Sequence, residues 1–235
     1  MVISTHSFSK FDSELESLRS KVLEMGGIVE EQIKNAITAL VDADSKLARI
    51  VIDTDEKVNS LEKLIDENCL LVLVKRSPAA GDLRFVSTVQ KTISDLERIG
   101  DESTKIARAA LRIYEGDRMG KPSLSDIKSM AKLVSGMLHE SLDSFARLDP
   151  EVSLEVRKED EAVDEIYQSC MRTQLTFILE DPRVISTSLE VIYIAKALER
   201  IGDHSENIAE YVVYIVKGAD VRHSSNKDIK KELKS

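Results

Sequence analysis

A hexapeptide that occurs twice constrains this chain more than any other feature. Leu-Glu-Arg-Ile-Gly-Asp runs from Leu96 to Asp101 and again from Leu198 to Asp203. Each copy places a glutamate and an aspartate four residues apart, and such residues are neighbours on one face of a helix. Two copies of one acidic step indicate a duplicated unit that carries a duplicated site.

Apolar residues recur at alternating intervals of three and four through most of the chain, which is the period of an amphipathic helix. With only 9 Gly and 4 Pro among 235 residues, and no Trp, the chain has little material for turns and an aliphatic core. The sequence predicts few, long helices. Asp44 and Ser45 separate the first two, and the others begin at Ser77-Pro78, Ser125, Asp149-Pro150 and Asp181-Pro182, the last ending near Gly218.

Matching positions in the two halves are separated by an almost constant offset. Asp55 and Asp160 differ by 105 residues, whereas the hexapeptides differ by 102, so the second half has lost three residues around one hairpin tip. We predict an all-α fold made of two tandem repeats of a three-helix bundle, with six long helices. The first repeat covers residues 1–117 and the second 118–218. The charged tail, 219–235, is expected to be disordered or weakly helical.

The second helix of each half carries its own polar step at the same spacing, Asp55 with Asn59 and Asp160 with Asp164. Helices joined by a short connection are antiparallel neighbours, so residues equally far from the tip lie side by side. The steps of each half are mirrored about the tip in this way. We expect the side chains to converge, although the hand of each bundle, which decides this, does not follow from the sequence.

Four oxygen-bearing side chains in one place repel one another, and a multivalent cation removes that repulsion. Oxygen ligands suit hard ions such as Mg²⁺, Ca²⁺, Mn²⁺ or ferric iron, and the space between two helices could hold several bridged ions. The alternative is a solvated acidic face without a ligand. The predicted metal ligands are Asp55, Asn59, Glu97, Asp101, Asp160, Asp164, Glu199 and Asp203.

Two glycines and a histidine beside the acidic steps have open interpretations. Gly100 and Gly202 each cost roughly 1 kcal/mol inside a helix relative to Ala. They serve either close packing against the first or fourth helix or clearance for an ion cluster. His204 adjoins Asp203 but points about 100° away around the helix, so a ligand role for it is the weaker alternative.

Composition and motifs exclude several classes of function. The net charge of −9 argues against nucleic acid as a partner, because phosphate backbones select basic surfaces. No nucleophile–base pair, phosphate-binding glycine loop or metalloprotease motif is present, so we expect no enzyme activity. Cys69 and Cys170 read as core residues in a reducing compartment. Without an apolar leader or spanning segment, a cytoplasmic protein is expected.

The hexapeptides, the segment from Pro78 to Arg84 and the run from Asn207 to Glu210 resemble the PhoU family of phosphate-transport regulators, over roughly residues 10–218. The resemblance implies two three-helix bundles. It implies a negative regulator of phosphate uptake and of the phosphate-starvation response, with the phosphate ABC transporter and its sensor histidine kinase as partners at the membrane. It also implies multinuclear metal clusters, iron foremost with Mg or Mn as alternatives, on the eight residues named above. Asn59 departs from the family pattern, because a carboxylate is expected there.

Three functions follow from these observations. The first is a metal-binding adaptor that represses phosphate signalling by protein contact, reaching the membrane only through its partners and compatible with a homodimer. The second is a helical metal store or redox protein. The third is a scaffold whose acidic faces are only solvated.

Overall fold

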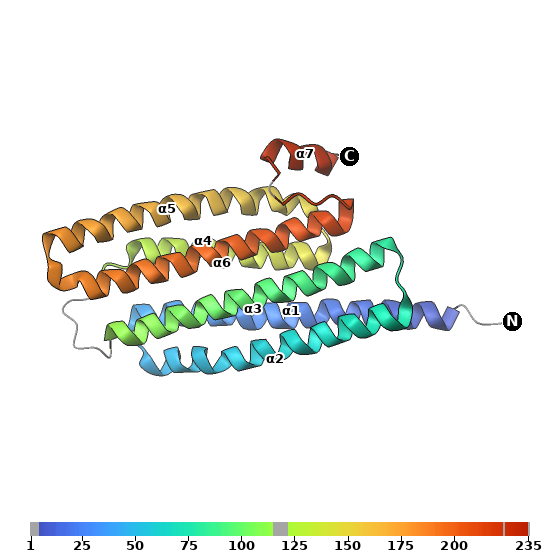
Figure 1. Ribbon diagram of the computed structural model, residues 1–235, viewed down its shortest axis with the longest axis horizontal. Helices are drawn as coiled ribbons and strands as arrows, with labels where there is room; N and C mark the ends of the chain where they lie inside the picture. The colour runs from blue at the N-terminus through green and yellow to red at the C-terminus, as the bar shows by residue number, and fades with distance from the viewer. Residues whose placement is uncertain (1–4, 115–121, 223, 235) are drawn as a thin grey trace.

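The computed structural model describes residues 5–114, 122–222 and 224–234, and within these ranges every regular element is a helix (Figure 1). The all-α prediction is confirmed. The predicted boundary at residues 117 and 118 lies outside the described residues. The elements are α1 (Thr5–Asp42), α2 (Ser45–Arg76), α3 (Ala80–Tyr114), α4 (Ser125–Arg147), η1 (Pro150–Val152), α5 (Ser153–Glu180), η2 (Pro182–Val184), α6 (Ile185–Lys217) and α7 (Asn226–Lys234).

Most of the predicted helix ends are confirmed. Three aspartates accept backbone N–H groups from within the next three residues, which satisfies donors that have no partner inside the helix. They are Asp44, Asp149 and Asp181. The proline after Asp149 and the one after Asp181 each begin a short 3₁₀ turn that leads into the following α-helix. Gly218 ends α6 with φ of 74°, a conformation that glycine adopts without strain.

Ser77 has a different role from the one predicted. It ends α2 instead of starting α3: its backbone N–H donates to the carbonyl of Leu73, and its φ is 46°. The proline that follows disfavours the right-handed helical conformation at Ser77, so α2 cannot continue through it. Helix α3 begins only at Ala80.

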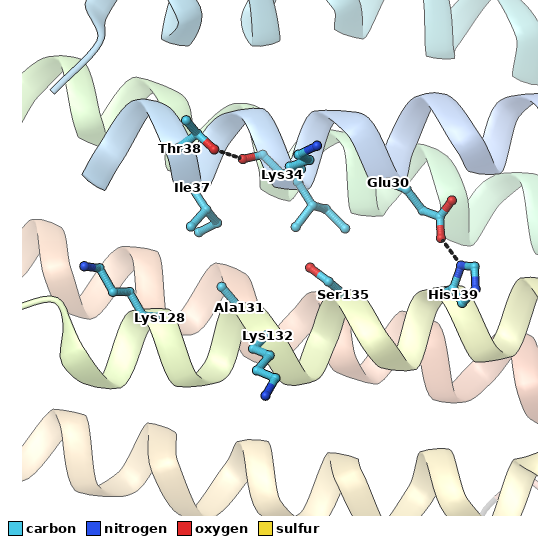
Figure 2. A pocket seen from close by; sticks show the side chains of 10 residues that line it. Glu30, Lys34, Ile37, Thr38, Lys128, Ala131, Lys132, Ser135 and His139 are labelled. Carbon is cyan, nitrogen blue, oxygen red and sulfur yellow. Dashed lines mark hydrogen bonds and ion pairs between the residues drawn. The ribbon is translucent and has the colours of Figure 1, made fainter. Parts of the chain in front are cut away.

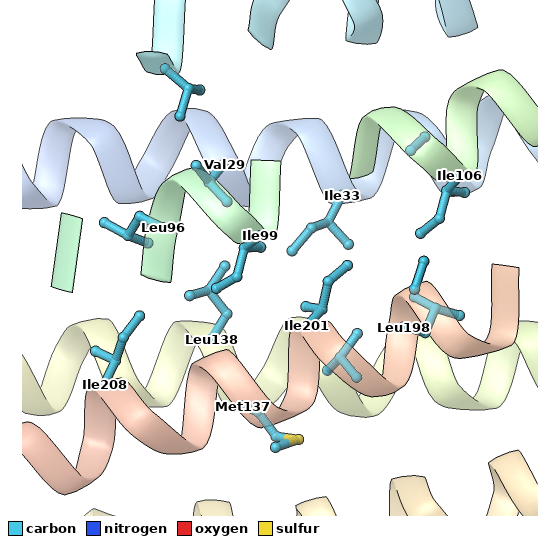
Figure 3. Close-up of a cluster of buried hydrophobic side chains, with 14 of the residues drawn as sticks. Val29, Ile33, Leu96, Ile99, Ile106, Met137, Leu138, Leu198, Ile201 and Ile208 are labelled. Carbon is cyan, nitrogen blue, oxygen red and sulfur yellow. The ribbon is translucent and has the colours of Figure 1, made fainter. Parts of the chain in front are cut away.

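The six long helices run along one axis in antiparallel pairs (Figure 1). Helices α1, α2 and α3 pack on one another, as do α4, α5 and α6, and the two groups meet mainly where α3 lies against α6, with a smaller contact between α1 and α4. One cluster of buried aliphatic side chains runs through all six helices. Figure 3 shows part of this cluster, in which Val29 of α1, Ile99 of α3, Leu138 of α4 and Ile201 of α6 lie close together.

Ion pairs add to this α3–α6 contact. Arg112 of α3 donates through Nε and Nη2 to the buried carboxylate of Glu190, at 2.8 and 2.7 Å. Arg200 of α6 donates to the buried Glu102 at 3.2 Å. Paired guanidinium groups make burial of these two carboxylates tolerable, because an unpaired buried charge costs several kcal/mol. The antiparallel α3–α6 contact therefore fixes the two hexapeptides against each other.

Two sequence predictions about burial need correction or refinement. The apolar period of α2 predicts Ile50 on its inner face, but Ile50 is 55% exposed, and Ala48 and Val51 are buried instead. The tail forms the nine-residue helix α7, because Ile229 and Val221 are buried against Val213 of α6. Among the described helices, none combines the length and apolar character needed to cross a membrane.

Candidate metal site

The four predicted ligands of the second half lie together along α5 and α6, and we call them the second acidic cluster: Asp160, Asp164, Glu199 and Asp203. Burial raises the pKa of the Asp160 carboxyl to about 8, and the charges of Glu206 and the other three cluster members act in the same direction. Burial and the charges of Glu199 and Asp164 also raise the pKa of Asp203. Asp164 and Glu199 line one hollow of about 660 Å³. A cation in this hollow would meet the carboxylates of Asp164 and Glu199, whereas Asp203 lines a different hollow.

The four predicted ligands of the first half lie along α2 and α3 and form the first acidic cluster: Asp55, Asn59, Glu97 and Asp101. Burial and the charge of Asp101 raise the pKa of Asp55 and of Glu97, with smaller shifts than at Asp160. Asp55 also accepts hydrogen bonds of 3.4 Å from the Asn59 amide and from the Thr104 hydroxyl. These neutral donors compensate part of its charge, so this cluster is the less acidic of the two.

A glycine next to each cluster allows a close approach of neighbouring side chains, most closely at Gly202. A Cβ atom on Gly202 would lie 2.8 Å from Asp160 Oδ1 and within 3.7 Å of Met137 and Val134 of α4. A Cβ on Gly100 would lie 3.1 Å from the Oε1 atom of Gln32 of α1. The predicted close packing against the first and fourth helices is therefore confirmed. Because Gly202 has no side chain, the Asp160 carboxylate can lie directly against α6.

The residues present fit a hard cation in their chemistry but do not form a closed ligand set. Buried oxygens of Asn59 (Oδ1), Gln32 (Oε1) and Glu159 (Oε2) have no hydrogen-bond partner, although a buried polar atom normally has one. Yet within the described ranges no three His, Cys, Asp or Glu side chains lie close enough together to hold an ion. Binding a cation would therefore require these side chains to come closer together than the structure places them.

Sequence reasoning missed three polar residues around the clusters. Glu206, one turn beyond Asp203, is the strongest charged influence on Asp160. Glu62 adds to the charge around Glu97. Gln32, 2% exposed on α1, donates at 3.4 Å to the Val51 carbonyl and directs its free oxygen toward Gly100. Glu206 follows Asp203 by three residues and could have been found from that spacing, whereas Gln32 comes from a third helix and carries no such signal.

His204 and Arg200 act between the halves. The Nδ1 atom of His204 lies 2.7 Å from Oδ1 of the buried Asp95 on α3, so the imidazole is engaged outside the cluster. Arg200 forms an ion pair with Glu102 of α3, across the contact between the halves. Both side chains, together with Asp101 and Asp203, line a hollow of about 350 Å³ between α3 and α6.

A separate groove of about 480 Å³ lies between α1 and α4 (Figure 2). Its rim carries Lys128, Lys132 and His139, and its floor is apolar. His139 turns toward Glu30, at 2.9 Å, while the side chains of Lys128 and Lys132 turn away from each other (Figure 2).

The cysteines behave as predicted. Cys69 and Cys170 are free, and both are buried. Burial raises the pKa of the Cys69 thiol to about 12 and that of Cys170 to about 11. Neutral thiols at these positions are packing residues and take no part in the clusters.

The fold and the clusters define an all-helical protein with one acidic cluster in each half. Comparison with known proteins identifies its class. The family model described as the PhoU domain matches residues 22–110 and again residues 127–212. The chain therefore belongs to the PhoU family, whose relatives are named as accessory or regulatory proteins of phosphate transport.

The similarity extends along nearly the whole chain. The phosphate-specific transport system accessory protein PhoU homolog of Pseudomonas aeruginosa is 44% identical over 98% of this chain and 96% of its own length. The accessory protein PhoU of Escherichia coli (strain K12) is 42% identical, over 98% and 95%. The crystal structure of PhoU from P. aeruginosa superposes with a TM-score of 0.86, covering 89% of this chain and all of that one. The phosphate transport system regulatory protein PhoU from Streptococcus pneumoniae gives 0.83 at 30% identity, covering 90% and 99%.

Proposed function

We propose that this chain is a metal-binding, cytoplasmic negative regulator of phosphate uptake and of the phosphate-starvation response. It would act by contact with the phosphate ABC transporter and its sensor histidine kinase, and not as an enzyme. Membership of a family whose relatives are named as accessory or regulatory proteins of phosphate transport carries this proposal. We further propose that its two halves are tandem three-helix repeats, which the double match of one family domain supports.

The metal half of the proposal rests on the clusters. In the second cluster, burial and neighbouring negative charge raise the pKa of Asp160 and of Asp203, which means that they oppose the ionisation of these two carboxyls. A hard cation with two or three charges, iron foremost and Mg or Mn as alternatives, reverses that penalty because it favours the ionised form. When bound, such ions would tie α5 to α6, and in the first half α2 to α3. Bound metal would thereby stiffen the surfaces that partners meet.

The metal proposal is tested by elemental analysis of the chain purified without chelator. In Asp160→Ala with Asp203→Ala, metal in the second half should be lost while helical content, followed by circular dichroism, is unchanged. The matched control is Glu155→Ala with Glu180→Ala, which removes two exposed carboxylates of α5 and should keep the native metal content. Unchanged stoichiometry in the cluster variant would count against the site. Uptake of many ions with turnover of oxidation state would favour a metal store instead.

The regulatory proposal is tested in a strain that lacks the chromosomal gene and carries a phosphate-starvation reporter. With ample phosphate, the reporter should be high without the protein and low again when the native chain is supplied. The native chain should also co-purify with the phosphate transporter or the sensor kinase. A reporter that ignores the native chain would contradict the regulatory role.

A further inference from the structure

The tip of the α2–α3 hairpin exposes several aliphatic side chains, and three of them have an exposed aliphatic counterpart in the second half. Leu70 and Val74 lie one turn apart on the last part of α2, with exposed fractions of 50% and 82%. Leu83, in the first turns of α3, is 47% exposed. Residues four apart on a helix form a continuous ridge, so Leu70 and Val74 present one apolar edge. We call these three residues the first tip triad.

The tip of the α5–α6 hairpin repeats this arrangement, and we call its residues the second tip triad. Leu175 and Leu179 of α5 are 51% and 84% exposed, and Ile185 of α6 is 47% exposed. They follow the first triad by 105, 105 and 102 residues, the same offsets that relate Asp55 to Asp160 and Glu97 to Glu199. The two triads therefore occupy equivalent positions, and their exposures agree within two percentage points.

The other exposed large hydrophobic residues among the described residues have no such match. At the same offsets the other half carries a polar, buried or half-buried residue. Ile50 corresponds to Glu155, Leu64 to Ser169, Leu71 to Thr176, Phe177 to the buried Val72, Leu189 to Ser87, Tyr193 to Lys91 and Val216 to the half-buried Tyr114. Single exposed apolar residues are ordinary on protein surfaces, but a matched set that stays apolar where its surroundings have diverged indicates a contact made twice.

We propose that the two tip triads are docking surfaces for two identical subunits of a symmetric partner, each tip receiving the same aliphatic surface from one subunit. This inference rests on the proposed function, which requires a protein partner. The tips lie at opposite ends of the long axis (Figure 1). Copies of this chain that met through both tips would build a filament or a ring of many copies, because each copy would always offer a second tip in the opposite direction. A partner with its own two-fold symmetry satisfies both ends at once.

Two-point docking has a quantitative signature. When one tip is bound, the second tip meets its own subunit at a high effective concentration, which raises the overall affinity on the order of 100-fold or more. Loss of either tip should therefore remove the same increase in affinity. Val74→Asp and Leu179→Asp place a charge at the most exposed member of each triad, where the fold is least affected. The matched control is Ile50→Asp, an exposed aliphatic residue whose counterpart is already Glu155.

The experiment measures binding of the full-length native chain and these variants to two probes, the purified phosphate transporter in lipid nanodiscs and the dimeric cytoplasmic part of the sensor kinase. For one probe, each single variant should lose about 100-fold in affinity, the two losses should agree within about threefold, and the double variant should bind still more weakly. Ile50→Asp should bind as the native chain does. Circular dichroism and thermal unfolding verify that all variants fold.

Several results would overturn the inference. One is a double variant that binds both probes as tightly as the native chain. Another is a loss confined to one tip, which would mean a single contact. Concentration-dependent growth of the native chain in light scattering, abolished by Val74→Asp, would identify a second copy as the occupant. Failure of the native chain to bind either probe would overturn the proposed function, and this inference with it.

Discussion

The two acidic clusters share one frame but differ in charge. In the second, Asp160 lies against Gly202 with Asp164 and Glu206 nearby, whereas in the first the equivalent positions are Asn59 and Thr104. Burial and repulsion accordingly raise the pKa of Asp160 to about 8, while the pKa of Asp55 rises less. Ionised Asp160 therefore requires a counter-charge, whereas neutral hydrogen bonds partly stabilise ionised Asp55 in the equivalent helix pair. We therefore expect the second cluster to bind a cation more tightly.

The largest expected effect comes from the glycines. Ala at position 202 places Cβ 2.8 Å from Asp160 Oδ1, so the carboxylate must move, and metal affinity in the second half should fall by about 100-fold, or about 2.7 kcal/mol. Ala at position 100 meets Asp55 only at 3.7 Å, so its effect on the first half should stay within about threefold. Gly136→Ala, with no atom near the added Cβ, is the control. Calorimetric titration with Mn²⁺ or Fe²⁺ measures the metal affinity of all three variants. Equal losses of affinity from alanine at positions 100 and 202 would contradict the proposed difference between the two clusters.

The next effect concerns stability of the metal-free protein. In the unfolded chain Asp160 loses its proton near its ordinary value of 3.8, but in the folded chain it holds that proton up to about pH 8. The folded state binds more protons across this window, so its stability falls as pH rises through it. Asp160→Asn should remove that loss and raise the free energy of unfolding at pH 8.5 by roughly 1–2 kcal/mol. Urea unfolding at pH 5.5 and 8.5 measures it, with Glu180→Gln as the control; an Asn variant with the native pH dependence would contradict the assignment.

A smaller effect is expected when the first cluster is converted toward the second. Asn59→Asp supplies the missing carboxylate, and at about 4–5 Å one added charge contributes about 1 kcal/mol, so cation affinity in the first half should rise about fivefold. Asn68→Asp makes the same change elsewhere on α2, where the native amide donates to the Leu64 carbonyl, and should leave affinity unchanged. Should both variants behave alike, the gain would come from net charge and not from the cluster.

Helix positions were predictable because their signals are local. The apolar period, three aspartate caps and Gly218 gave the helices and most of their ends. Ser77 was assigned to the wrong helix because a serine before proline can end one helix or start the next, and local sequence does not distinguish these. Ile50 satisfied the period of α2 but lies at its edge, where neighbouring helices decide burial. The tail became helix α7 because Ile229 finds a partner in Val213, a contact distant in sequence.

The site was predictable only along each hairpin. The mirrored spacing about each tip brought Asp160 near Asp203 and Asp55 near Asp101, as expected. The contribution of α1, through Gln32, depends on how α1 packs on the α2–α3 hairpin, and the pairing of His204 with Asp95 depends on how the two halves meet. That arrangement follows from packing between α3 and α6, which no local pattern encodes. Bound metal on the eight predicted ligands stays a prediction.

The most direct test of the central claim is anomalous X-ray scattering at the iron and manganese edges from crystals of the natively purified protein. The account predicts anomalous density between α5 and α6 at Asp160, Asp164, Glu199 and Asp203, with weaker density or none at the first cluster. Density absent from the second cluster in protein that contains metal by elemental analysis would contradict it.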